Sequence, residues 1–133
     1  MAHVQCIVVT PERTVLDREA EFVALPLYDG EIGIAPGHSP LIGRLGCGEL
    51  RILHEEGLDQ LYVEGGFVQV LGGVVSVLTG KAVAGGDLDE AVAREQLDAA
   101  RGRPANTPDL MAMRDRAVMQ ARAQLRVARR AKA

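Results

Sequence analysis

The sequence predicts an α+β protein, in which an N-terminal antiparallel β-sandwich, or flattened barrel, precedes a C-terminal two-helix hairpin. Fourteen of the fifteen glycines lie at or before residue 86, and alanine becomes frequent beyond it. Short runs of β-branched and aliphatic residues fill the glycine-rich part. The net charge changes from −6 over residues 1–86 to +3 over residues 87–133. We therefore expect a sandwich domain over 1–86 and a helical hairpin over 87–133.

Six short apolar runs in the first part have the composition of β-strands. They are VQCIVVT, EFVALPL, ELRIL, LYVEGG, FVQVL and VVSVL. Turn signals containing glycine separate several of these runs, and Gly72-Gly73 is expected to form a two-residue hairpin loop. Strands this close together, with no helix-length segment between them, are typical of a sandwich or barrel.

The second part has the start and stop signals of two helices. Asp87 and Glu90 have the spacing of a capping box and begin the predicted helix DLDEAVAREQLDAAR. Gly102, Arg103 and Pro104 are expected to end this helix. Thr107 is a good cap for a second helix over about 108–130. This helix carries a thin, alanine-rich apolar stripe of Met111, Val118, Ala121, Leu125 and Ala128. Because the stripe buries little apolar surface, we expect the hairpin to be weakly held and able to move.

Composition excludes several classes of protein. No apolar run approaches the roughly 18 residues that a membrane span needs, and MAHVQCIVV lacks the features of a signal peptide, so we expect a cytoplasmic protein. Two cysteines without CxxC spacing predict neither a disulfide framework nor a metal site. A net charge of −3 with only four aromatic residues argues against nucleic-acid binding.

The stretch GEIGIAPGHSPLIGRL, residues 30–45, concentrates glycine and proline around one histidine. It lacks the lysine and hydroxyl residue of a phosphate-binding loop. His38 has no nucleophile and carboxylate at suitable positions, so it is interpreted as a turn residue bonded to the backbone rather than a catalytic base. Its apolar residues fit either a protein-protein contact or the internal packing of short strands, and the sequence does not decide between them. No constellation for an active site is found.

The same stretch belongs to a longer family resemblance. VVTPERTVLDREAEFVALPLYDGEIGIAPGHSPLIGRL resembles the start of the epsilon subunit of F-type rotary ATP synthases, and the pattern over 30–41 is highly specific to that family. The similarity continues through GELRI, YVEGGFVQV and VSVL and resumes in LDEA and AQLRVA. The resemblance implies the sandwich and hairpin fold. It also implies a non-catalytic rotor subunit that couples the c-ring to the gamma shaft, with helices that restrain ATP hydrolysis.

The resemblance further implies partners and contact residues. The partners are gamma, the c-ring and the catalytic alpha and beta subunits, on the cytoplasmic face of a bacterial inner membrane. Contact with the c-ring or gamma is implied for Glu31, Ile32, Gly33, His38, Ile42 and Gly43. An inhibitory contact with an acidic segment of beta is implied for Arg122 and Arg126, which follow the last acidic residue of the chain, Asp115. The resemblance also implies that the subunit is peripheral to the membrane and reaches it through the complex.

The sequence departs from the family at two informative places. Cys47 replaces a proline that usually precedes GEL. Some bacterial members carry the nucleotide motif Ile/Leu-Asp-x-x-Arg-Ala, of which Leu88, Asp89 and Ala93 remain here while Val92 replaces the arginine. Further arginines of those members match Ala99, Gln120 and Gln124. We therefore expect no ATP binding, no other cofactor and no metal.

Two other functions are kept as alternatives. One is a free-standing binding module that binds a different partner through its helical tail, and the other is a small enzyme. Co-purification separates a rotor subunit from a free-standing module, because only the rotor subunit brings down gamma and the catalytic subunits.

Overall fold

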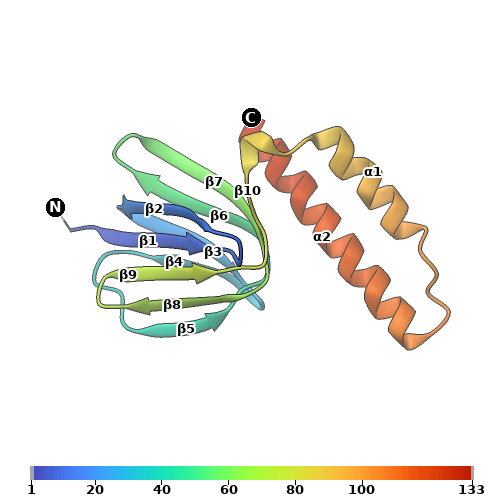
Figure 1. Cartoon of the computed structure of the whole chain (residues 1–133), viewed down its shortest axis with the longest axis horizontal. Helices are drawn as coiled ribbons and strands as arrows, with labels where there is room; N and C mark the ends of the chain where they lie inside the picture. Colours follow the sequence, from blue (N-terminus) through green and yellow to red (C-terminus); the bar gives the residue numbers. More distant parts are fainter. Residues whose placement is uncertain (1, 133) are drawn as a thin grey trace.

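The computed structural model describes residues 2–132, and its first part is two five-stranded sheets packed face to face (Figure 1). The first sheet has the strand order β2 (Thr14–Ala20), β1 (Val4–Val9), β9 (Val74–Leu78), β8 (Phe67–Leu71) and β5 (Leu41–Arg44). The second has the order β10 (Ala82–Ala84), β7 (Gly57–Glu64), β6 (Cys47–His54), β3 (Phe22–Leu27) and β4 (Gly30–Ile34). The predicted β-sandwich is confirmed.

The strand pairing is antiparallel with one exception. β1 runs parallel to β9, whereas the other pairs that build the two sheets are antiparallel. Side chains that alternate along each strand fill the space between the sheets. The largest of the fully buried apolar side chains there are Leu25, Ile34, Leu50 and Ile52, joined by valines such as Val8, Val68 and Val77.

Four strands were not predicted from the sequence. β2 reads TVLDREA, whose charged residues hide its pattern, and β10 has only three residues. β4 and β5 lie inside the glycine- and proline-rich stretch over 30–45. Ile34 is buried there, while Ile32 and Leu41 pack against the core. Internal packing, one of the two alternatives for this stretch, therefore accounts for most of its apolar residues, and Ile42 alone is exposed among these four.

Two turns require glycine because of their backbone conformation. Gly72 and Gly73 have φ of 58° and 79° between the paired residues Leu71 and Val74, which confirms the predicted two-residue hairpin loop. Gly66 has φ of 109°, and a Cβ atom added to it would lie 1.9 Å from the carbonyl oxygen of Leu78. The start of β8 thus passes directly against the backbone at the end of β9.

The second part forms the predicted helix pair. A short 3₁₀ turn, η1 (Gly85–Asp87), leads into α1 (Glu90–Arg101) and then α2 (Pro108–Lys132). The predicted cap Asp87 is wrong, because Asp87 lies in the 3₁₀ turn. The side chain of Asp89 instead accepts the backbone N–H groups of Ala91 and Val92. The Thr107 cap is confirmed by a 3.1 Å bond from the N–H of Leu110 to its hydroxyl.

The apolar stripe of α2 is buried along only part of the helix. Ala121, Leu125 and Ala128 are buried as predicted, but Met111 is exposed. The difference arises because the N-terminal part of α2 extends past the sandwich with only α1 beside it (Figure 1). Ala93 and Leu97 of α1 pack against Ala121 and Leu125 in a small cluster that holds the two helices to each other.

We predict that Gly66→Ala destabilises the sandwich by at least about 2 kcal/mol, because it combines a left-handed φ with a backbone clash. Gly86→Ala is the matched control, since Gly86 has neither a left-handed φ nor an atom within 4 Å of the added Cβ. Urea unfolding of both variants measures the difference. Equal stability of the two variants would show that the Gly66 turn relaxes without cost.

Candidate functional site

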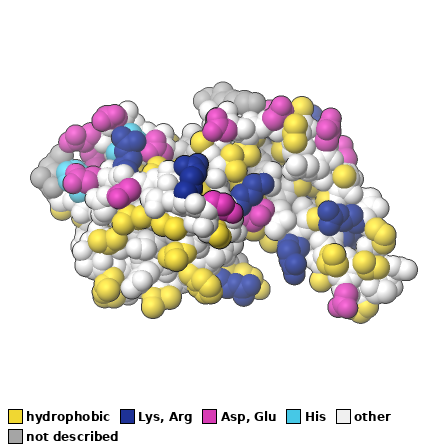
Figure 2. Space-filling view, viewed as in Figure 1, with side chains coloured by type: hydrophobic (Ala, Val, Ile, Leu, Met, Phe, Trp, Pro, Cys, Tyr) yellow, Lys and Arg dark blue, Asp and Glu magenta, His cyan; other side chains and the backbone are white. Residues whose placement is uncertain are grey.

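The outer face of the first sheet exposes four large apolar side chains. The exposed fractions are 77% for Ile42, 61% for Phe67, 55% for Leu71 and 52% for Leu78. Arg44, Phe67 and Leu78 lie side by side in register across β5, β8 and β9. Apolar side chains spread over this side of the sandwich in Figure 2. We call Ile42, Phe67, Leu71 and Leu78 the apolar face; Gln69 and Ser76 lie between them on the same side of the sheet. Exposed apolar residues gathered on one side are typical of a protein-protein contact.

The sequence analysis named Ile42 but missed the other three residues of the apolar face. The signal was present in FVQVL and VVSVL, where the outward positions at the strand ends are apolar although the central ones are Gln69 and Ser76. A strand with one solvated face normally alternates apolar and polar residues. Apolar residues at the outward strand ends therefore favour a protein contact on this side of the sheet.

The contact residues named from the family resemblance do not form one surface. Ile42 lies on the outer face of the first sheet, while Glu31 projects from the outer face of the second, where it pairs with Arg51. Ile32 packs against the core, and the position of a Gly43 side chain points to Leu27 inside the sandwich. The sandwich can therefore offer two opposite faces to partners.

Two of the named glycines have internal reasons for their small size. A Cβ atom at Gly33 would lie 2.4 Å from Cζ of Phe22, whose ring covers it. A Cβ atom at Gly43 would lie 3.1 Å from Cδ2 of Leu27 and 3.4 Å from Cγ1 of Val68. Large substitutions at either glycine would disturb the domain itself and are poor tests of a partner contact.

His38 lies in the segment between β4 and β5. Its Nδ1 atom is 2.7 Å from the carbonyl oxygen of Ser39, so that nitrogen carries the proton and donates it. The prediction of a turn histidine bonded to the backbone is confirmed. The ring remains available at Nε2 for contact with a partner.

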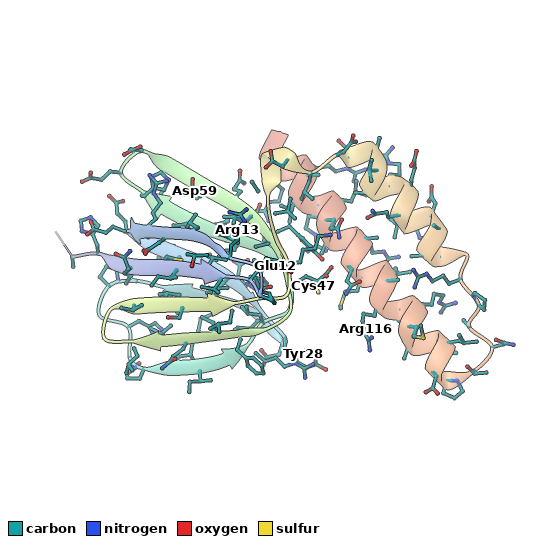
Figure 3. The ribbon with its side chains drawn as sticks, in the orientation of Figure 1. Glu12, Arg13, Tyr28, Cys47, Asp59 and Arg116 are labelled. Carbon is teal, nitrogen blue, oxygen red and sulfur yellow. The ribbon has the colours of Figure 1, made fainter. Side chains whose placement is uncertain are left out.

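The hairpin is held on the outer face of the second sheet. Tyr62 of β7 is fully buried against Ala123 and Val127 of α2, and Cys47 and Leu88 flank this contact. Figure 3 shows Cys47 at the boundary between the sandwich and α2. The Tyr62 hydroxyl donates a 2.7 Å hydrogen bond to Glu64. Burial and then this carboxylate raise the pKa of Tyr62, so the phenol stays neutral.

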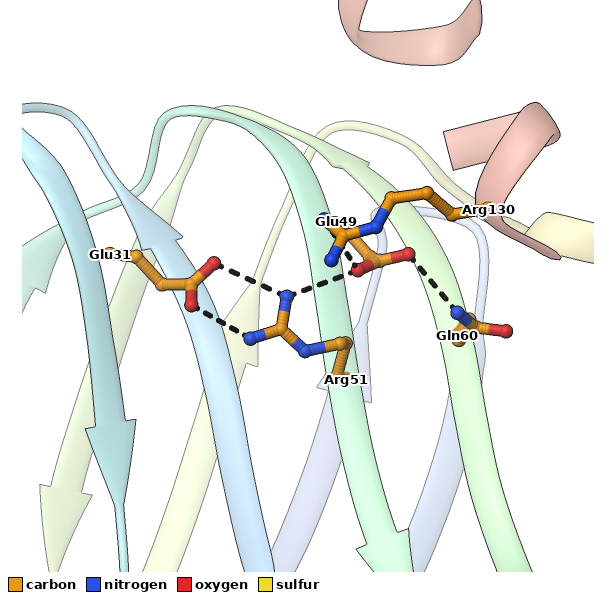
Figure 4. A network of polar contacts seen from close by, with 5 residues as sticks. All are labelled: Glu31, Glu49, Arg51, Gln60 and Arg130. Carbon is orange, nitrogen blue, oxygen red and sulfur yellow. Dashed lines mark hydrogen bonds and ion pairs between the residues drawn. The ribbon is translucent and has the colours of Figure 1, made fainter. Parts of the chain in front are cut away.

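A cluster of charged groups (Figure 4) is built around Glu49, which is paired in register with Tyr62. The carboxylate of Glu49, only 4% exposed, is 3.1 Å from Arg51 and 3.4 Å from Arg130 of α2. Gln60 donates to its other oxygen at 3.3 Å. Arg51 also binds Glu31 at 2.7 Å. The hydrogen bonds to Glu31 and then Glu49 raise the pKa of the Arg51 guanidinium.

A second concentration of charge lines a groove of about 700 Å³ between α1 and α2. Its basic residues are Arg94, Arg101, Arg122, Arg126, Arg129 and Arg130, and Leu97, Asp98 and Leu125 complete the lining. Arg122 and Arg126 are exposed, and neither forms an ion pair within the part of the chain that the structure describes. Arg122 and Arg126 were named from the sequence as contacts for beta, but the groove that they share with Arg94 and Arg101 of α1 was not predicted.

The remnants of the nucleotide motif have structural roles. Asp89 caps α1, Ala93 is buried against α2, and Leu88 packs beside Tyr62. Val92, which replaces the motif arginine, is 47% exposed. The arginines of the groove supply positive charge close by, so the absence of arginine at Val92 and Ala99 does not leave the groove without cations.

Residues 2–132 contain no group of three or more His, Cys, Asp or Glu side chains arranged to hold a metal ion. Neither helix in this range is long and apolar enough to span a bilayer. The prominent features are instead an exposed apolar face, a helix pair packed on the second sheet and clusters of charge. These features define a class of protein whose surfaces suit contacts with other proteins.

The comparisons with known proteins identify the assembly. Residues 3–85 match the family described as "ATP synthase, Delta/Epsilon chain, beta-sandwich domain". The ATP synthase epsilon chain of Rhodopirellula baltica is 50% identical over 126 residues, covering 95% of this chain and 98% of that protein. The epsilon chain of Bordetella avium is 40% identical over 134 residues, covering 98% and 94%. This chain belongs to the ATP synthase epsilon-chain family, whose members are subunits of the enzyme and not themselves catalytic.

Solved structures share the fold. A chain in the Euglena gracilis mitochondrial ATP synthase structure of OSCP, F1 and c-ring has a TM-score of 0.81 and 25% identity, covering 100% of this chain and 83% of its own length. A chain in the central stalk and c-ring structure of the Tetrahymena thermophila mitochondrial ATP synthase has a TM-score of 0.71 at 13% identity, covering 94% and 96%. The second likeness supports the fold alone.

We predict that the arginine groove binds ATP and tripolyphosphate equally weakly, with dissociation constants above the micromolar range. The arginines attract any polyphosphate, but the substitution at Val92 removes the motif arginine, and exposed contacts of this kind are screened by salt. Isothermal titration at low and physiological salt measures both affinities. Micromolar binding of ATP that tripolyphosphate does not share would contradict the prediction.

Proposed function

We propose that this chain is the non-catalytic central-stalk subunit of a proton-translocating F-type ATP synthase, without an active site of its own. It couples the c-ring to the gamma shaft through the sandwich, and its hairpin restrains ATP hydrolysis. The observation that carries this proposal is the apolar face. The outer side of the first sheet exposes four large apolar side chains on β5, β8 and β9, which suit a lasting contact, and family membership supplies a partner.

The two faces of the sandwich suit two partners. The apolar face, together with His38, binds gamma, because a rigid apolar surface of this kind favours a lasting contact. Glu31 and the edge formed by β4 face the c-ring, where a charged, exposed carboxylate gives a more polar contact. The hairpin covers part of the second sheet and leaves the apolar face free.

The location follows from the assembly. The subunit is peripheral, on the cytoplasmic face of the cell membrane, and reaches the membrane only through the complex. The bacterial sources of the two epsilon-chain relatives support a bacterial membrane rather than an organelle.

The hairpin is suited to a regulatory role. It is held to the sandwich by a small apolar contact around Tyr62 and by the ion pair from Arg130 to Glu49. Arg122 and Arg126 present positive charge that an acidic segment of a catalytic beta subunit would complement when the helices extend.

We predict that the paired substitution Ile42→Ser and Phe67→Ser weakens binding to gamma at least about tenfold, because it removes two central apolar anchors. Leu58→Ser is the matched control: Leu58 is 49% exposed but belongs to β7 in the second sheet. Co-purification with a tagged gamma subunit measures the effect. Equal recovery of both variants would contradict the apolar-face contact, and recovery of neither variant nor the unaltered chain would favour a free-standing module.

We also predict that replacing both Arg122 and Arg126 by Glu raises the ATPase activity of the assembled complex. Each exposed ion pair contributes only about 0.2–1 kcal/mol, so a several-fold increase requires both changes. Replacing Arg103 and Arg116 by Glu provides a control with the same change of charge, because both residues lie outside the groove. Unchanged activity with the subunit still bound at full stoichiometry would leave the two arginines as solvated residues of a helix surface.

A further inference from the structure

The charged cluster on the second sheet connects the edge strand β4 to the C-terminal part of α2. Glu31 lies at the exposed edge strand β4, and Arg130 lies near the C-terminal end of α2. Between them stand Arg51 and Glu49 of β6, so that negative and positive groups alternate along the cluster (Figure 4). The edge and the hairpin are therefore joined by a continuous row of ion pairs.

Each inner member of the row is shared. The Nη1 atom of Arg51, at 3.1 Å, and the Nη1 atom of Arg130, at 3.4 Å, both contact the same oxygen, Oε1, of Glu49. Arg51 divides its guanidinium between Glu49 and Glu31, with a close 2.7 Å contact from Nη2 and a 3.4 Å contact from Nη1 on the Glu31 side. Two arginines thus compete for one carboxylate oxygen, and Glu31 draws one of them away.

The strand between the two charged strands allows this reach. β3 lies between β4 and β6, and its residue Ala24 is opposite both Gly33 and Arg51 in register. Ala24 is small and buried, so the Arg51 side chain passes over β3 without obstruction. A larger residue at this position would separate Arg51 from Glu31.

We propose that this row of ion pairs couples the β4 edge to the docking of the hairpin. When a cationic side chain of a partner pairs with Glu31, Arg51 turns fully to Glu49 and repels Arg130 from the shared oxygen. The contact between Arg130 and Glu49 weakens, and the hairpin is released more easily. The identity of the partner at Glu31 rests on the proposed function, but the coupling is a property of this chain alone and is testable without any partner.

The chain contains its own reporter of hairpin docking. Cys47 lies half-buried beside Tyr62 and Val127, where α2 covers the sheet. Burial and then the nearby Glu64 raise the pKa of its thiol, so lifting α2 exposes the sulfur and favours the reactive thiolate. Cys6 is fully buried in the sandwich core, with burial first among the causes that raise its pKa to about 12. Cys6 is therefore not modified by a thiol reagent unless the sandwich unfolds.

The test measures the rate at which a thiol reagent modifies Cys47 in the full-length chain. Glu31→Gln removes the charge that draws Arg51 away, and we expect it to raise the rate about two- to fivefold. Arg130→Gln removes the docking contact and raises the rate at least as much. Asp29→Asn is the matched control, because Asp29 is an exposed acid two residues from Glu31 and is not a member of the row. The control leaves the rate unchanged.

Combined variants separate the row of ion pairs from general charge effects. In the Arg130→Gln background, Glu31→Gln has no further effect, because the contact that it weakens is already absent. In the Arg51→Gln background it also has no effect, because the connection is cut. The coupling would be overturned if Glu31→Gln raised the rate of Cys47 modification by the same factor in either background as in the unaltered chain. An unchanged rate in the single variant Glu31→Gln would also overturn it. Neither outcome bears on whether the chain binds gamma, so the proposed function is judged separately.

Discussion

The buried carboxylate of Glu49 is the constraint on which the joining of the two domains depends. A carboxylate that is 4% exposed loses most of its hydration, at a cost of several kcal/mol unless charged partners replace the water. Arg51 and Gln60 come from the sandwich, but Arg130 comes from α2. The sandwich therefore holds its buried charge best when the hairpin is docked. Tyr62 adds an apolar contact of modest size beside it, and together they hold the hairpin on the second sheet.

This arrangement divides the surface of the sandwich between tasks. The hairpin occupies part of one sheet, and the other sheet presents the apolar face around Phe67 to solvent. Movement of the hairpin would therefore leave the apolar face intact. The proposed function requires this separation, since the subunit would have to remain attached to its partners while the hairpin changes position.

The sequence predicted those features that depend on local chemistry. The Gly72-Gly73 turn, the Thr107 cap and six of the ten strands were foreseen, because turn residues, caps and β-branched runs act within a few residues of chain. β2 and β4 were missed because charge and glycine mask strands whose pairing is decided by distant neighbours. The charged cluster could not be foreseen either. Glu31, Arg51 and Arg130 are widely separated in sequence, and only the strand register and the docking of α2 bring them together.

The central claim is that the sandwich provides attachment and the hairpin provides restraint. The most direct measurement is the ATPase activity and subunit stoichiometry of the complex assembled with and without residues 87–133. The account predicts that the shortened chain remains bound at full stoichiometry, because the apolar face is intact, while ATP hydrolysis increases. Loss of the shortened chain from the complex, or unchanged hydrolysis with the chain retained, would contradict the division of roles.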